Sequence, residues 1–120
     1  MEYDVFYCFY AESDDGVPST KPVRMPLTAI CDDLLPRMTS EGDFIGLIDA
    51  QGVTLQACCE PDENCYWVEM PAPKEKGSHG QYCTFDELME IFKKLPAEFT
   101  AAAFPGFAFE SWDGVQIVED

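Results

Sequence analysis

Hydrophobic and polar residues alternate with two different periods along the chain, and these periods predict where strands and helices lie. Residues 3–10 are mostly aromatic or β-branched, which favours a strand that is largely buried on both faces. The segment 11–22 is polar and contains Asp14-Asp15-Gly16 and two prolines, a composition typical of a loop. The chain is therefore expected to begin with a buried strand and a polar loop.

A first helix is predicted over about 26–35. Pro26 suits the first turn of a helix, where its missing N–H would have no partner in any case. Pro36 disfavours helical geometry at Leu35 and is expected to end the helix there. The apolar residues that recur at helical spacing and form the predicted buried stripe are Leu27, Ile30, Cys31 and Leu34.

Three strands are predicted next, over 44–48, 53–58 and 65–70. Gly52 can adopt the left-handed conformation that closes the turn 49–52, so the first two strands should form a hairpin. A second turn, over 60–64, leads into the third strand. Three consecutive antiparallel strands form a meander.

A second helix is predicted over 85–95. Thr84 is a good N-cap, and Glu87 three residues later completes a capping box. Lys93 and Lys94 suit the negative C-terminal end of the helix dipole, and Pro96 follows them. The predicted buried stripe consists of Phe85, Leu88, Met89, Phe92 and Leu95.

The last part of the chain predicts a C-terminal hairpin. Residues 107–112 and 115–118 flank Asp113-Gly114, a dipeptide that favours a two-residue turn. No repeat or long linker divides the sequence, which indicates a single domain over 1–120. The predicted fold is therefore α+β, an antiparallel sheet with a central three-stranded meander and a C-terminal hairpin, packed by two helices.

Composition adds one strong feature, an excess of acidic residues. The 23 Asp and Glu residues outnumber 7 Lys and Arg residues, for a formal net charge of −16, while 47% of the residues are hydrophobic. The apolar content is sufficient for a core, but the charge disfavours binding to nucleic acid or to an anionic membrane. The sequence has no positively charged leader and no run of about 18 apolar residues, so a cytoplasmic location is expected.

Candidate catalytic and metal-binding residues are few. His79 is the single histidine, and it lies in a polar segment, 74–80, that is predicted to be a loop exposed to solvent. The six cysteines are expected to stay reduced and to serve as small core residues. A zinc site lacks the usual paired spacing, and its candidate ligands would be Cys58, Cys59, Cys65, His79 and Cys83. We therefore expect no catalytic residue, no metal and no cofactor, with a small zinc protein as an alternative.

The acidic residues form clusters that would suit a basic protein partner. A net charge this far from zero destabilises the compact state by self-repulsion, and a basic partner surface would account for it. Tyr66 and Trp67 are candidate aromatic contacts, although strand alternation predicts that one of the two lies in the core. The acidic candidates for partner binding are Asp14, Asp15, Asp32, Asp33, Glu60, Asp62 and Glu63.

Four stretches together resemble immunity proteins of bacterial polymorphic toxin systems. They are GDFIGLIDAQGVTLQ (42–56), YWVEMP (66–71), GSHGQ (77–81) and CTFDELMEIFKKLP (83–96). The resemblance implies a non-enzymatic inhibitor that covers the basic cleft of a cognate toxin, often a nuclease or a nucleotide-modifying enzyme. It implies no particular contact residue, because these families share no universal binding motif. A phage-type inhibitor that mimics DNA is the main alternative.

Overall fold

The computed structural model of the chain describes residues 1–10, 15–60 and 65–111. Its strands form one antiparallel sheet of eight strands in the order β2-β1-β4-β5-β6-β7-β8, and β3 also pairs with β1. The strands are β1 (Glu2–Phe9), β2 (Asp15–Val17), β3 (Val23–Pro26), β4 (Phe44–Ile48), β5 (Thr54–Cys59), β6 (Tyr66–Ala72), β7 (Gly77–Cys83) and β8 (Ala108–Ser111).

Two helical segments accompany the sheet. The first begins as α1 (Leu27–Ala29) and continues through the π-helical turn η2 (Ile30–Leu34) and the 3₁₀ turn η3 (Leu35–Arg37). The second is α2 (Phe85–Lys93). Two further 3₁₀ turns are η4 (Pro73–Glu75) and η5 (Ala101–Ala103). No helix in the described part of the chain has both the length and the apolar character needed to cross a membrane.

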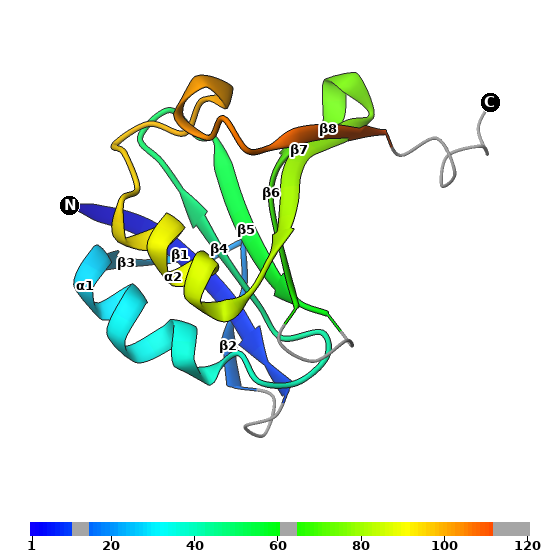
Figure 1. The fold of residues 1–120 in the computed structure, drawn as a ribbon. Coiled ribbons are helices and arrows are strands. Elements are labelled where there is room, and N and C mark those ends of the chain that lie inside the picture. The colour runs from blue at the N-terminus through cyan, green and yellow to red at the C-terminus, as the bar shows by residue number, and fades with distance from the viewer. Residues whose placement is uncertain (11–14, 61–64, 112–120) are drawn as a thin grey trace.

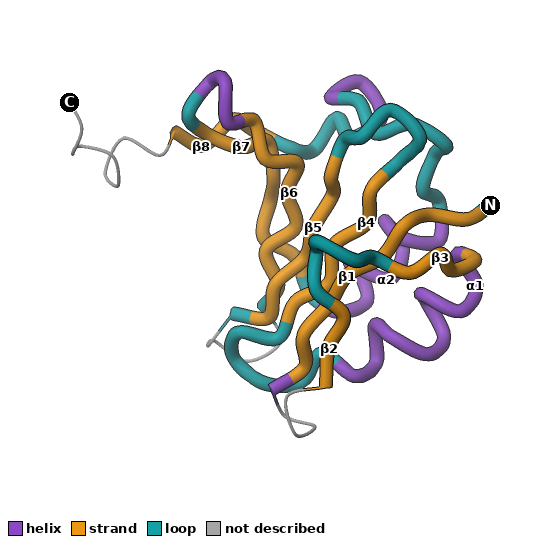
Figure 2. Tube along the Cα trace, turned by 180° about the vertical axis from the view of Figure 1, so that it is seen from behind, coloured by secondary structure: helices purple, strands orange, loops and turns teal. Residues whose placement is uncertain are grey.

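Both helical segments lie against the same face of the sheet (Figure 1), and the view from behind shows the strands in front of them (Figure 2). The core fills the space between this helix-covered face and the helices. Burial alternates along β5, for example, because successive strand residues point to opposite faces. Fully buried core side chains include Val5, Phe9, Ile30, Leu35, Ile45, Leu47, Leu55, Val68, Leu88 and Phe92.

The predicted α+β fold and its central meander are confirmed. β4, β5 and β6 are consecutive in the sheet, and the meander continues into β7 and β8. Gly52 has a φ of 84° at the β4–β5 turn, as its predicted role requires. The capping box is present, because the Glu87 N–H donates to Thr84 Oγ1 at 3.2 Å and the Thr84 N–H donates to Glu87 Oε1 at 2.9 Å.

The prediction of a polar loop around His79 is wrong. The chain turns at η4, and strand β7 begins directly afterwards at Gly77. His79 therefore lies within β7, which pairs with β6 along its whole length. The glycines and polar residues of β7 have low intrinsic strand preference. Pairing with β6 on one side and β8 on the other supplies the backbone hydrogen bonds that the local sequence does not predict.

Two boundaries also differ from expectation. Strand β2 lies within the segment predicted to be a loop, where it pairs with the end of β1. Pro36 does not end helical structure but stands in the first turn of η3, a position where a backbone N–H is not needed. In the C-terminal hairpin, β8 pairs with β7, whereas the turn at 113–114 and the strand over 115–118 lie outside the described residues.

Two buried carboxylates fix the connections between elements. Asp43, at the start of β4, accepts hydrogen bonds from the N–H groups of Tyr10, Thr39 and Ser40 at 2.7–3.0 Å. Asp49, at the end of β4, accepts one from the Phe99 N–H at 2.7 Å and so ties the segment after α2 to the β4–β5 turn. Both side chains are less than 10% exposed, and their hydrogen bonds offset the cost of burial.

Candidate binding face

The face of the sheet opposite the helices carries two rows of side chains that the register aligns across β1, β4, β5, β6 and β7. Side chains directly opposite each other in antiparallel strands share a face, so each row can be read from the pairing. The first row is Phe6, Gly46, Gln56, Glu69 and Gly80, and the second is Cys8, Phe44, Cys58, Trp67 and Tyr82. We call these ten residues the open face.

Two glycines of the open face make room for aromatic rings. A Cβ atom at Gly46 would collide with the ring of Phe6, which therefore lies directly over the β4 backbone. A Cβ atom at Gly80 would stand 2.8 Å from Cζ2 of Trp67. Glycine inside a strand often marks a close approach of this kind. The ring of Phe6 consequently lies on the backbone of β4, and the indole of Trp67 reaches the backbone of β7 at Gly80.

The aromatic side chains of the open face contact one another in pairs. The ring centroids of Trp67 and Tyr82 are 4.8 Å apart, and those of Phe6 and Phe44 are 6.3 Å apart in an edge-on arrangement. Tyr82, near the end of β7, is 63% exposed. Aromatic side chains gathered on a sheet face without helices, with tyrosine and tryptophan among them, are typical of protein interaction sites.

Glu69 stands between these rings and is held from two sides. The Trp67 indole N–H donates to Glu69 Oε1 at 2.9 Å, and Gln56 Nε2 donates to Glu69 Oε2 at 2.7 Å. In the described part of the chain, no lysine, arginine or histidine forms an ion pair with Glu69. The carboxylate is therefore oriented by neutral donors, and its charge has no basic partner among these residues.

The open face has no positive charge of its own on its five strands. The sequences of β1, β4, β5, β6 and β7 contain neither lysine nor arginine. Arg24 lies on the neighbouring strand β3 and forms two ion pairs. Its Nη1 is 3.1 Å from Asp4 Oδ1, and its Nε is 3.6 Å from Glu2 Oε1. Arg24 is thus paired with carboxylates of β1, and no described basic residue pairs with Glu69 in the middle of the face.

The open face is hollowed by three adjoining cavities that all include Phe6. One of about 420 Å³ lies among Phe6, Phe44, Trp67 and Glu69. Another, of about 900 Å³, extends from Phe6 toward the β4–β5 turn and η4, and a third, of about 330 Å³, extends toward β2. Each cavity shares lining residues with its neighbour, and we call the three together the groove of the open face.

Of the two predicted aromatic contacts, Trp67 lies on the open face and Tyr66 lies in the core. The Tyr66 hydroxyl donates to the Met38 carbonyl at 3.1 Å, and its ring contacts Phe85 of α2. Burial raises the pKa of Tyr66, and the neighbouring Cys59 adds to this effect. The predicted alternation of the pair is therefore confirmed, with Trp67 as the member that a partner could reach.

Of the predicted acidic residues, the structure describes the side chains of Asp32, Asp33 and Glu60. Asp32 and Asp33 are exposed on η2, in the helical layer on the other side of the sheet. Glu60 is half-buried directly after β5. Asp15 belongs to β2, but its side chain is not described, and the remaining predicted acids, Asp14, Asp62 and Glu63, lie outside the described residues.

Sequence reasoning missed most of the open face, including Phe6, Phe44, Glu69 and Tyr82. The sequence did contain one indication of this face, namely Gly46 and Gly80. Glycine inside a strand often marks a place where another group approaches the backbone closely. Recognising the face, however, requires the register of five strands, and that register depends on contacts far apart in the sequence.

The cysteines and His79 of the zinc alternative are not brought together. Cys58 points to the open face, whereas Cys59 and Cys83 flank Tyr66 on the helix-covered face. Burial is the main reason that the pKa of Cys58 rises to about 11 and that of Cys83 to about 12, so both thiols are protonated at neutral pH. The imidazole ring of His79 contacts the ring of Phe109, and its Nε2 lies 3.5 Å from Glu75 Oε1. In the described residues, no three His, Cys, Asp or Glu side chains are placed to hold a metal ion.

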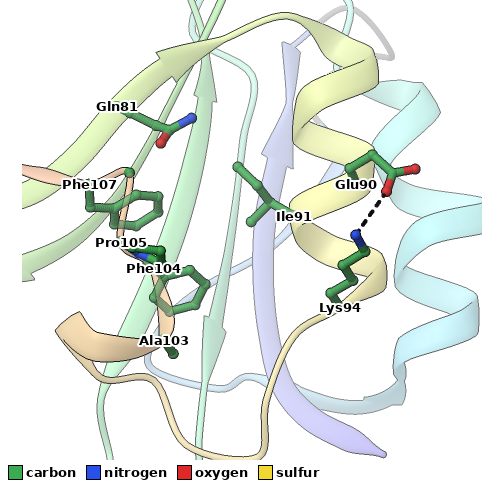
Figure 3. A pocket seen from close by; sticks show the side chains of 9 residues that line it. Gln81, Glu90, Ile91, Lys94, Ala103, Phe104, Pro105 and Phe107 are labelled. Carbon is green, nitrogen blue, oxygen red and sulfur yellow. Dashed lines mark ion pairs between the residues drawn. The ribbon is translucent and has the colours of Figure 1, made fainter.

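A further cavity, of about 270 Å³, lies on the helix-covered side between α2 and the segment around η5 (Figure 3). Ile91 and the rings of Phe104 and Phe107 form its apolar wall. At its edge, Glu90 and Lys94 form an exposed ion pair at 3.6 Å. The volume is slightly below the range of about 300–1,000 Å³ usual for small-molecule sites. The charges at its edge neutralise each other, so the open face is the stronger candidate site.

Comparison with protein-family models, with curated proteins and with solved structures found no significant match for this chain. The resemblance to immunity proteins therefore stays a prediction.

Proposed function

We propose that this chain is a non-enzymatic binding protein that neutralises a cognate bacterial toxin. The open face would lie over a basic surface of the toxin, an active-site cleft that binds nucleic acid or a nucleotide. One observation carries the proposal: a sheet face without helices carries exposed Tyr82 and half-buried Trp67 beside Glu69, a carboxylate that forms no ion pair with a described basic residue.

The aromatic composition of the face supports a role in binding a protein. Trp67 and Tyr82 contact each other on the surface, and tryptophan and tyrosine are enriched among the residues that contribute most to binding energy. The rings are also held in place, Trp67 by its hydrogen bond to Glu69 and Phe6 by its position over Gly46. A preorganised surface loses less conformational entropy when the partner binds.

The charge supports a basic partner. With a net charge of −16, the chain produces a negative field that accelerates the approach of a positively charged protein, most strongly at low salt. Asp32 and Asp33 lie in the helical layer, so they would act on the approach of the toxin and not as contacts at the open face. Basic residues in a toxin cleft that normally hold phosphate would meet Glu69 and the rings around it.

The proposal can be tested by purifying the tagged chain from its source organism and identifying the retained protein by mass spectrometry. The retained protein is then expressed in a bacterial host with and without this chain. We expect one basic protein in equimolar amount, which stops growth when expressed alone and is tolerated when the chain is coexpressed. A retained protein that does not impair growth, or several unrelated DNA-binding proteins, would contradict the proposal, and the second result would favour the DNA mimic.

Two matched variants show which face is used. Trp67→Ala removes an aromatic side chain from the open face, whereas Phe109→Ala removes one from β8 on the opposite side of the sheet, where Phe109 is 45% exposed. We expect Trp67→Ala to lose the protection of growth and Phe109→Ala to retain it, with both variants folded by circular dichroism. The reverse result would place the binding surface on the helix-covered side.

A further inference from the structure

We infer that the cavity among Phe6, Phe44, Trp67 and Glu69 receives an arginine side chain of the partner protein. This inference rests on the proposed function, and it identifies the chemical group that the open face recognises. It follows from three features of the cavity: aromatic walls, an oriented carboxylate and the absence of a competing positive charge on the five strands of the face.

The walls of the cavity suit a flat cation. Phe6 and Phe44 meet edge to face on one side, and the indole of Trp67 lies on the other. The faces of aromatic rings carry partial negative charge and attract a cation within about 6 Å of the ring centre. Tryptophan gives the strongest attraction of the three aromatic types. A positively charged side chain that enters the cavity is therefore stabilised by its walls.

Glu69 suits two parallel hydrogen bonds from one donor group. A carboxylate offers about four acceptor positions. In this structure Trp67 donates to Oε1 and Gln56 donates to Oε2, so each oxygen is used once by a described residue and retains a second acceptor position. These two donors also fix the plane of the carboxylate. A guanidinium group, which donates through two N–H bonds in a fixed geometry, matches this arrangement.

Arginine is favoured over lysine for the same reasons. The guanidinium is planar, stacks on aromatic faces and is weakly hydrated, whereas the lysine ammonium is compact and strongly hydrated. The cavity of about 420 Å³ lies within the usual range for sites that enclose a small group. Charge complementarity with the chain, whose net charge is −16, adds to the attraction for a partner's arginine.

The test uses the full chain with Trp112→Phe, which leaves Trp67 as the only tryptophan. Its indole N–H, which donates to Glu69, is followed by ¹H–¹⁵N NMR during titration with Nα-acetyl-arginine amide. The neutral Nα-acetyl-citrulline amide and Nα-acetyl-lysine amide serve as comparison probes. We expect a saturable shift with the arginine probe, at least 10-fold weaker binding of the lysine probe and no saturable shift with citrulline. Equal responses to arginine and citrulline, or to arginine and lysine, would overturn the inference.

A pair of variants with the same change in charge tests the role of Glu69. Glu69→Gln removes the carboxylate at the cavity, and Glu90→Gln removes one from the exposed surface of α2. We expect Glu69→Gln to weaken binding of the arginine probe at least 10-fold, while Glu90→Gln changes it less than 2-fold. Equal weakening by both variants would show a general effect of net charge and would overturn the assignment of the cavity.

Failure of this inference is distinguishable from failure of the proposed function. If the arginine probe does not bind but the toxin is neutralised and Trp67→Ala abolishes neutralisation, the arginine pocket alone is wrong. If the arginine probe binds as expected but the protein retained by the chain is not a toxin, the pocket stands and the proposed function is wrong.

Discussion

The ring of Phe6 in β1 lies directly over Gly46 in β4, and the absence of a side chain at Gly46 is what allows this contact. Phe6 is only 8% exposed, even though it points away from the helices; its ring rests on the β4 backbone and also contacts the ring of Phe44. All three cavities of the open face include Phe6. The position of one ring therefore determines the shape of the groove.

Gly46→Ala should displace this ring. The new Cβ collides with the Phe6 ring, so we expect a loss of about 1–3 kcal/mol in the free energy of unfolding, as is usual for an overpacked site. Urea denaturation followed by circular dichroism measures the loss. In Phe6→Ala the ring is absent, and adding Gly46→Ala to that variant should cost much less than in the wild type. Equal costs in the two backgrounds would contradict the described contact.

Asp43 should make the stability of the protein depend on pH. Burial alone would raise its pKa, but hydrogen bonds from the N–H groups of Ser40, Thr39 and Tyr10 and from the Ser40 hydroxyl outweigh this effect and hold the pKa below its usual value. A carboxyl with a depressed pKa stabilises the folded state above its unfolded pKa of about 3.9, and this contribution is lost as pH falls through the folded pKa.

The variant Asp43→Asn isolates this effect from the other acidic residues. At pH 7 it should be less stable than the wild type by about 1.5–3 kcal/mol, because charged hydrogen bonds to a buried acceptor are lost. The difference should be constant from pH 7 to pH 5 and should shrink below about pH 4. Urea denaturation of both proteins across this range provides the comparison. A difference that stays the same at pH 2.5, or one that grows on acidification, would contradict the assignment.

Cys58 and Cys83 should react slowly with alkylating reagents in the folded protein. Burial, together with Glu60 near Cys58 and Glu87 near Cys83, raises their pKa values to about 11 and 12. Only the thiolate reacts, so at pH 7.5 we expect alkylation at least ~10-fold slower than in the urea-unfolded chain. The rates should still rise above pH 9, where an ordinary thiol with a pKa of about 8.5 has levelled off. Peptide mass spectrometry after iodoacetamide treatment resolves each site, and equal rates in both states would contradict the burial of these thiols.

The long-range acidic field and the direct contacts of the open face should affect the kinetics of toxin binding differently. Changing Asp32 and Asp33 together to Asn should slow association with the toxin by roughly 2- to 5-fold at low salt and reduce its dependence on salt, because these residues act through the long-range field. Trp67→Ala should mainly speed dissociation, because it removes a contact. Stopped-flow mixing measures both rates. If the double Asn variant associates as fast as the wild type at low salt, capture by the acidic field is wrong.

Elements defined by local interactions could be predicted from the sequence. The Thr84–Glu87 capping box joins residues three apart, and the turn at Gly52 depends on the conformation of a single residue. Alternation within β6 predicted that Tyr66 and Trp67 lie on opposite faces without reference to the rest of the chain. These features were predictable because their causes lie within a few residues.

Elements defined by pairing across the sheet could not be predicted. Strand β7 has a sequence typical of a loop, and its hydrogen bonds to β6 and β8 depend on residues up to 34 positions away, as in the pair Gly77↔Ser111. The groove has the same origin, because Phe6 and Glu69 belong to one row only after β1, β4, β5 and β6 have aligned. Clusters of acids can be read from the sequence, whereas the aromatic face around Glu69 depends on this alignment.

Site-specific photo-cross-linking tests the use of the open face most directly. In one variant the photoreactive residue p-benzoylphenylalanine replaces Tyr82, which is 63% exposed on the open face. In a second variant it replaces Phe109, on the opposite side of the sheet. Both variants are irradiated in cells of the source organism, and cross-linked proteins are identified by mass spectrometry. The account predicts a cross-link from position 82 to one basic toxin and none to that toxin from position 109. A toxin cross-linked from position 109 and not from position 82 would contradict it.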